Sequence, residues 1–209
     1  MDLPTMRARV RVDLHDEDSD AYRWEDDVLD RHIERAVAEV SLVAPVETEA
    51  TVQTSAGSRD LDLSALTGRV AVFGVEYPVG EYPPVMPGFV VWGDVLSLRI
   101  ESEPEADEDV LIRYGVLHTL DGSGTTLPER LHDLVATGAA AYAAIEWANF
   151  AVNRVNVGGP EVAREYLNWG RERLRDFVVQ LDRMGSAPSQ SPEPQPRRRL
   201  GVGRLVSSE

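Results

Sequence analysis

Apolar residues recur at helical spacing over the longest stretch of the sequence, from Leu127 to Asn153. Pro128 and Glu129 stand at its start, where a helix favours proline and a negative charge. The apolar positions are Leu131, Leu134, Val135, Tyr142, Ile145, Ala148 and Val152. Alanines fill the turns between them, which allows a second helix to approach closely. At about 1.5 Å per residue the predicted helix is roughly 40 Å long, which indicates a scaffold rather than a catalytic loop.

A further helix is predicted after the glycine-containing stretch 155–159. Pro160 restarts the helical pattern, and an apolar stripe continues to Gly185, so the two helices are expected to form a hairpin. Four aromatic residues lie near the predicted turn, namely Trp147, Phe150, Tyr166 and Trp169. We interpret them as a packed core at the closed end of the hairpin rather than a stacking platform for a ligand, because buried aromatic rings usually serve packing.

Two shorter helical patterns precede this hairpin. The first runs over Leu3–Leu14 behind Asp2, which is a candidate N-cap. The second begins at Glu25, carries aspartates in its first turn, and ends before Pro45. Residues 15–27 are dense in carboxylates and lack an apolar period. We therefore expect an exposed loop between the two helices.

The pattern changes completely between Val46 and about Asp121. Alternating segments and runs rich in Val, Ile, Phe and Tyr are separated by Gly, Pro and Asp, which predicts an antiparallel β module of five to seven short strands. The proline-rich segment 77–88 is interpreted as an edge or a loop, because proline cannot donate to a central ladder.

The predicted fold class is α+β. Residues 1–45 and 122–185 are each too small to bury their apolar faces alone, so we expect one discontinuous helical bundle into which the β module, residues 46–121, is inserted. Residues 186–209 are rich in Pro and Ser and then basic, which indicates a flexible tail that ends in a docking segment. The candidate docking residues are Arg197, Arg198, Arg199, Leu200, Val202, Arg204, Leu205 and Val206.

Composition narrows the classes of function. The chain of 209 residues carries a formal net charge of −15, which argues against a protein that grips DNA phosphates. It contains no cysteine, so disulfides and thiolate metal sites are excluded. We find no signal-peptide pattern and no apolar run of membrane-spanning length, and expect a soluble protein without a membrane partner.

Sequence motifs for phosphate, dinucleotide, zinc-protease or serine-hydrolase chemistry are absent, and the histidines at 15, 32, 118 and 132 stand alone. The one weak candidate is a calcium loop formed by Asp16, Asp18 and Asp20 with Asp27 at the twelfth position. The match is poor, because Ala21 takes the place of the required glycine and Asp27 is shorter than the usual glutamate. We therefore expect no metal, no cofactor and no enzymatic activity.

The helical parts, however, resemble a known family. Residues 6–41 (MRARVRVDLHDEDSDAYRWEDDVLDRHIERAVAEVS) are similar to the opening of the head–tail connector, or adaptor, proteins of tailed bacteriophages, in which an acidic turn and an aromatic residue, here Trp24, join two helices. Residues 129–153 and 164–184 resemble the long helical pair of that family. The resemblance covers the helical parts and not the β module.

This resemblance implies a structural protein of the virion at the head–tail junction, assembled in the host cytoplasm. Such proteins form a ring, usually of twelve subunits, between the portal protein and the tail or stopper protein. DNA passes through the ring without sequence-specific binding, and an acidic lumen keeps it from sticking. We expect the β module to lie at the periphery and to touch capsid or tail proteins, and residues 197–206 to dock on the portal.

Two other classes stay open on the sequence alone. The β module could be a sandwich that binds a carbohydrate or another ligand on a helical stalk, through exposed aromatic residues such as Tyr77, Tyr82 and Trp92. A metal-dependent enzyme would use Asp16, Asp18 and Asp20. The first alternative predicts a monomer or small oligomer with a ligand site, and the second predicts binding of a divalent metal.

Overall fold

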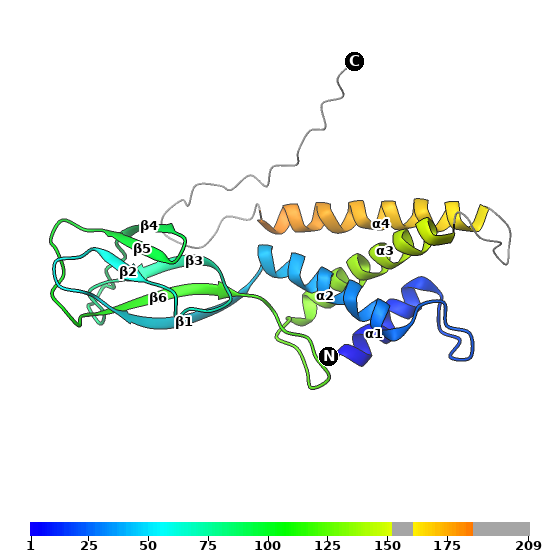
Figure 1. Ribbon diagram of the computed structural model, residues 1–209, viewed down its shortest axis with the longest axis horizontal. Coiled ribbons are helices and arrows are strands. Elements are labelled where there is room, and N and C mark those ends of the chain that lie inside the picture. Colours follow the sequence, from blue (N-terminus) through cyan, green and yellow to red (C-terminus); the bar gives the residue numbers. More distant parts are fainter. Residues whose placement is uncertain (152–160, 186–209) are drawn as a thin grey trace, which may run out of the picture.

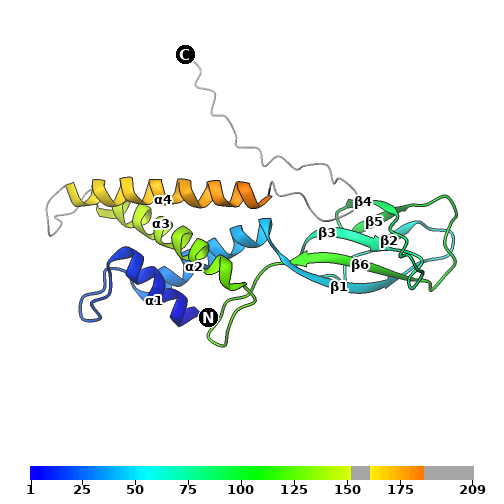
Figure 2. The ribbon, with the colours of Figure 1, turned by 180° about the vertical axis from the view of Figure 1, so that it is seen from behind.

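The computed structural model describes residues 1–151 and 161–185 and confirms the α+β fold class (Figures 1 and 2). The predicted turn at 155–159 and the tail at 186–209 lie outside the described residues. The elements are α1 (Leu3–Leu14), α2 (Asp26–Val43), β1 (Val46–Gln53), β2 (Asp60–Asp62), β3 (Arg69–Glu76), β4 (Gly88–Trp92), β5 (Val95–Arg99), β6 (Asp109–Val116), the 3₁₀ helix η1 (Glu129–Leu131), α3 (His132–Ala151) and α4 (Glu161–Gly185).

The two amino-terminal helices begin and end as their sequence signals predict. The backbone N–H of Thr5 donates to Asp2 Oδ1 at 2.9 Å, which caps α1, and His15 ends this helix in the left-handed conformation. Asp26 and Asp27 occupy the first turn of α2, where the helix dipole favours negative charge.

The long helix α3 begins at His132, later than Leu127, where the sequence predicts its start. Pro128 instead accepts a hydrogen bond from the Leu131 N–H at 2.9 Å, which forms the short helix η1. His132 Nε2 lies 3.1 Å from the Leu127 carbonyl oxygen, so this turn is held against the start of α3. The first turn is therefore 3₁₀ rather than α, a common variation at helix ends.

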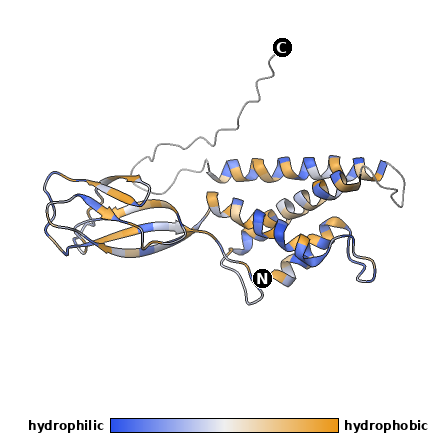
Figure 3. Cartoon of the chain, viewed as in Figure 1, coloured by the Kyte–Doolittle hydropathy of each residue, from blue (hydrophilic) through white to orange (hydrophobic). Residues whose placement is uncertain are grey.

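All four α-helices contribute to one hydrophobic core, with α3 packed against the other three. The alanine-rich stretch of α3 is buried, as expected for a helix that another helix approaches closely. A Cβ atom on Gly170 of α4 would lie 3.1 Å from the Ala141 carbonyl oxygen, and one on Gly138 would lie 2.8 Å from Phe177 Cε2. Hydrophilic and hydrophobic residues recur along α4, as in a helix with one covered face (Figure 3).

The β module contains two antiparallel three-stranded sheets, with strand orders β1-β6-β3 and β2-β5-β4. These six strands fall within the predicted range, and the proline-rich segment is a loop between β3 and β4. The module has a hydrophobic core of its own, formed by Leu61, Leu63, Leu66, Val72, Val75, Leu96, Leu98, Val110 and Ile112. It therefore does not depend on the helices for its buried surface.

Paired strands connect the β module to the helices. Val46 at the start of β1 lies opposite Val116 at the end of β6, so the chain enters and leaves the module at adjacent positions. Gly115 is covered so tightly that a Cβ atom there would lie 2.6 Å from Pro45 Cγ and 2.8 Å from Phe73 Cζ. The module extends from one end of the helical part (Figures 1 and 2). In the described ranges, no helix is long and apolar enough to cross a membrane.

Candidate functional site

The structure describes the acidic-loop residues but not the predicted docking residues. Residues 197–206 lie outside the described residues, so their expected contact with a portal stays a prediction. Asp16, Asp18, Asp20 and Asp27 all fall in the described part. Within residues 1–151 and 161–185, no group of three or more His, Cys, Asp or Glu side chains is arranged to hold a metal ion.

The acidic loop is exposed, as predicted, except at Asp16 and Trp24, which are buried. Asp16 Oδ2 accepts a hydrogen bond from Arg11 Nη1 at 2.6 Å, and Asp16 Oδ1 accepts one from the Arg23 N–H at 2.7 Å. Asp18 accepts from the Asp20 N–H, and Asp27 accepts from the Val28 N–H. The aspartates therefore serve separate local hydrogen bonds and an ion pair.

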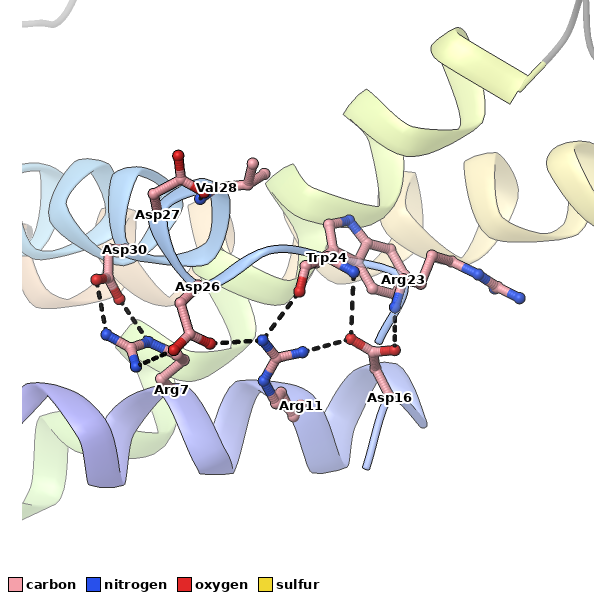
Figure 4. A network of polar contacts seen from close by, with 9 residues as sticks. All are labelled: Arg7, Arg11, Asp16, Arg23, Trp24, Asp26, Asp27, Val28 and Asp30. Carbon is pink, nitrogen blue, oxygen red and sulfur yellow. Dashed lines mark hydrogen bonds and ion pairs between the residues drawn. The ribbon is translucent and has the colours of Figure 1, made fainter. Parts of the chain in front are cut away.

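Two arginines of α1 tie this loop to α2 (Figure 4). Arg11 Nη2 donates to the Trp24 carbonyl oxygen at 2.9 Å and to Asp26 Oδ1 at 2.7 Å. Arg7 donates to the other oxygen of Asp26 at 2.6 Å and binds both oxygens of Asp30, at 2.8 and 2.7 Å. Asp26 thus bridges the two guanidinium groups. Bidentate charged hydrogen bonds of this kind fix orientation as well as distance, so α1, the loop and α2 are held in one arrangement.

The side chain of Trp24 fixes the loop to the long helices α3 and α4. Its indole Nε1 donates to the Ala143 carbonyl oxygen at 3.2 Å, and its ring lies 6.2 Å from the ring of Trp147 and 5.9 Å from that of Tyr166. The Arg23 guanidinium lies 4.6 Å from the centre of the Trp147 ring, at a cation–π distance. Of the four aromatic residues predicted to pack together, Trp147, Tyr166 and Trp169 pack against the core, whereas Phe150 is 59% exposed. The prediction also missed Trp24, since only the fold brings the loop to these rings.

A second polar group of residues lies between α2 and α3. The Tyr142 hydroxyl donates to Glu39 Oε2 at 2.7 Å, and burial together with this bond raises the pKa of Tyr142. His32 Nε2 is buried without a hydrogen bond and lies 3.1 Å from Glu146 Oε2. That distance suits an ion pair once the imidazole is protonated, but burial lowers the pKa of His32 more than the Glu146 carboxylate raises it. The neutral imidazole is therefore favoured at neutral pH.

The exposed aromatic residues of the β module form its most distinctive surface. Tyr82 in the β3–β4 loop is 97% exposed and Trp92 at the end of β4 is 80% exposed. Trp92 lies directly opposite Val95 in the β4–β5 hairpin, so both side chains point to the same, outer face of the sheet. Tyr77 differs, because its hydroxyl donates to Glu108 Oε2, which raises its pKa to about 12. Tyr82 and Trp92 are thus available to a partner, whereas the Tyr77 hydroxyl is engaged.

The helical part offers a second exposed surface on α4. Val178 and Val179 are both exposed, whereas Phe177 beside them is fully buried against α3. Charged residues surround the two valines along the same helix. This face is suited to contact with another protein chain rather than to chemistry on a small molecule.

Comparison with known proteins adds no family assignment. No protein-family model matches the sequence, and no curated protein matches it significantly. The function is therefore inferred from the residues and their arrangement, with the docking segment, the β-module aromatics and the exposed face of α4 as candidate interaction sites.

Proposed function

We propose that this chain is a structural subunit of the ring between the portal and the tail of a tailed bacteriophage. The observation that carries the proposal is the shared core of α1, α2, α3 and α4, although the β module separates these helices in the sequence. On this interpretation the helices form one discontinuous bundle, and the β module is an insertion. The resemblance to head–tail connectors extends to these helices and not to the β module, which departs from the shortest, all-helical members of that family.

The packing of α3 and α4 suits the wall of a ring. The glycines at 138 and 170 allow the two helices to approach closely, and close packing makes a helical pair stiff. One face of α4 is left uncovered, with exposed Val178 and Val179. We propose that this face contacts the neighbouring subunit.

The remaining parts have separate roles in this proposal. The β module lies at the periphery and touches capsid, tail or stopper proteins through Tyr82 and Trp92. Residues 197–206 dock on the portal through arginine and aliphatic side chains. The net charge of −15 reduces adhesion of DNA that passes through the lumen, because phosphates meet little positive charge. The ring assembles in the host cytoplasm, and its subunit acts without a cofactor and catalyses no reaction.

The proposal is tested by light scattering on the purified protein alone and mixed with a candidate portal. We expect either a ring of the free protein or a monomer that assembles on the portal. The variant Arg197→Ala/Arg198→Ala/Arg199→Ala should bind the portal more weakly. The matched variant Arg99→Ala/Arg113→Ala/Arg130→Ala, at exposed positions away from α4, separates charge loss in general from loss of the docking segment. A free protein that stays monomeric and ignores the portal would contradict the proposal.

A ligand-binding β module is the second candidate, favoured by the exposure of Trp92 and Tyr82. A flat indole ring on a sheet face can stack against a sugar or an apolar side chain. A glycan array with the full-length protein and the Trp92→Ala variant tests it. Binding that the variant loses, by a protein that stays monomeric with portal present, would favour this alternative.

A further inference from the structure

An open cleft of about 440 Å³ lies between α2 and the segment that connects β6 to η1. Ile33 and Val37 of α2 supply its apolar floor, together with Leu3 and Leu120. Leu117 also lines the cleft and is 44% exposed. An apolar surface of this kind, open to water, is suited to side chains of a bound peptide.

The edge of the cleft is acidic. Asp30, Glu34 and Asp121 line it, and none of its lining residues is Lys or Arg. Asp30 is already paired with Arg7, but Glu34 is exposed and forms no ion pair with any residue in the described ranges. Asp121 is also exposed, and hydrogen bonds from Ser123 and Gly124 hold its pKa low. Glu34 is therefore free to receive a cationic group, and Asp121 adds a second negative charge to the edge, although Ser123 and Gly124 already donate to its Oδ1.

We propose that residues 197–206 bind in this cleft of their own chain in the free subunit, from which docking on the portal would release them. Their sequence, RRRLGVGRLV, contains four arginines, four aliphatic residues and no acid, which complements an apolar floor with an acidic edge. The two glycines let the backbone approach the floor closely. The inference rests on the chemistry of the cleft and not on the connector function.

The segment can reach the cleft of its own subunit. Helix α4 ends at Gly185, where a Cβ atom would lie 3.3 Å from Val43 Cγ1 near the end of α2. Ala44 follows Val43 at the end of α2, and its carbonyl oxygen lies 2.8 Å from Nε2 of His118, which lines the cleft. Residues 186–196 span up to about 36 Å when extended, and the part of α2 between Val43 and the far end of the cleft is about 20 Å long. A neighbouring subunit is therefore not required.

Engineered cysteines test the proposal in the full-length chain, which has no native cysteine. Ala38→Cys lies in the cleft and Gly201→Cys lies in the middle of the segment. We expect this pair to form an intramolecular disulfide under mild oxidation at low protein concentration, as detected by non-reducing electrophoresis and peptide mass spectrometry. The matched pair Ser102→Cys/Gly201→Cys, with the first cysteine at an exposed loop of the β module, should react at least about tenfold more slowly.

Charge reversal at the acidic edge supplies a second readout. Adding Glu34→Arg to the first pair should slow disulfide formation about three- to tenfold, and more salt should reduce the difference. Glu101→Arg in the β module is the matched control, and circular dichroism checks that each variant is folded. Equal rates for both cysteine pairs, no effect of Glu34→Arg, or disulfide-linked dimers would overturn the proposal, the last by assigning the cleft to a second copy.

Discussion

Replacing Asp16 with alanine removes the centre of the polar network that joins α1 to the following loop. The side chains of Asp16 and Arg11 are each only 6% exposed. Asp16 accepts hydrogen bonds from Arg11 Nη1 at 2.6 Å, from the Arg23 N–H at 2.7 Å and from the Trp24 N–H at 3.3 Å. Alanine at this position leaves a buried guanidinium group and two backbone amides short of acceptors.

The expected loss of stability is large. Removing one partner of a buried ion pair costs about 3–5 kcal/mol, because the other charge stays buried and uncompensated. Arg11 keeps Asp26 and the Trp24 carbonyl oxygen, which reduces the loss, while the two amides add to it. We therefore expect Asp16→Ala to lower the free energy of unfolding by about 3 kcal/mol.

Urea unfolding followed by far-ultraviolet circular dichroism measures this loss. Asp18→Ala is the matched control, because the Asp18 side chain is exposed and accepts a single hydrogen bond in the described part of the chain, from the Asp20 N–H at 3.1 Å, and it should cost less than about 1 kcal/mol. Removing both charges in Arg11→Met/Asp16→Ala should restore part of the stability. Equal losses for Asp16→Ala and Asp18→Ala would refute the reasoning. So would a double variant whose free energy of unfolding falls by more than the two single losses added together.

Three further results are expected. Gly138→Ala should destabilise the protein by about 1–3 kcal/mol in thermal unfolding, because its Cβ would lie 2.8 Å from Phe177, and adding Phe177→Leu should relieve part of the loss. The pKa of His32 is lower in the folded chain than the ordinary 6.5, so the unfolded chain binds more protons below pH 6.5. The free energy of unfolding should accordingly fall as pH drops from 6.5 to 5, and His32→Gln should flatten this dependence. Trp92→Ala should change stability by less than about 0.5 kcal/mol but weaken binding of the β module's partner in a pull-down assay.

The local elements follow closely from the sequence. Leu3–Leu14 forms the predicted helix, since Asp2 caps it and Met6, Val10 and Leu14 face the core. The strands of the β module and its proline-rich loop lie where alternation and turn residues predict them. The close approach of α3 and α4 also follows from the alanines and glycines, because small side chains leave no other way to bury this surface.

Long-range contacts could not be predicted in the same way. Residues 15–27 are mostly exposed, as predicted, but composition does not show that Asp16 is buried beside Arg11 and pairs with it. Trp24 joins Trp147 and Tyr166 across more than a hundred residues, so no local pattern indicates that Trp24 belongs to this cluster. The acidic cleft needs Glu34 and Asp121 side by side, which depends on how the segment after β6 returns along α2.

Electron microscopy of the protein bound to a candidate portal tests whether the chain forms a ring at the head–tail junction. We expect a second ring stacked coaxially on the portal ring, with the helices forming its wall and the β modules projecting outward. Deleting residues 46–116 and joining the flanking segments with a short linker should remove the projections and leave the ring. A portal that carries no added ring, while the full-length protein is folded and present in excess, would contradict the account.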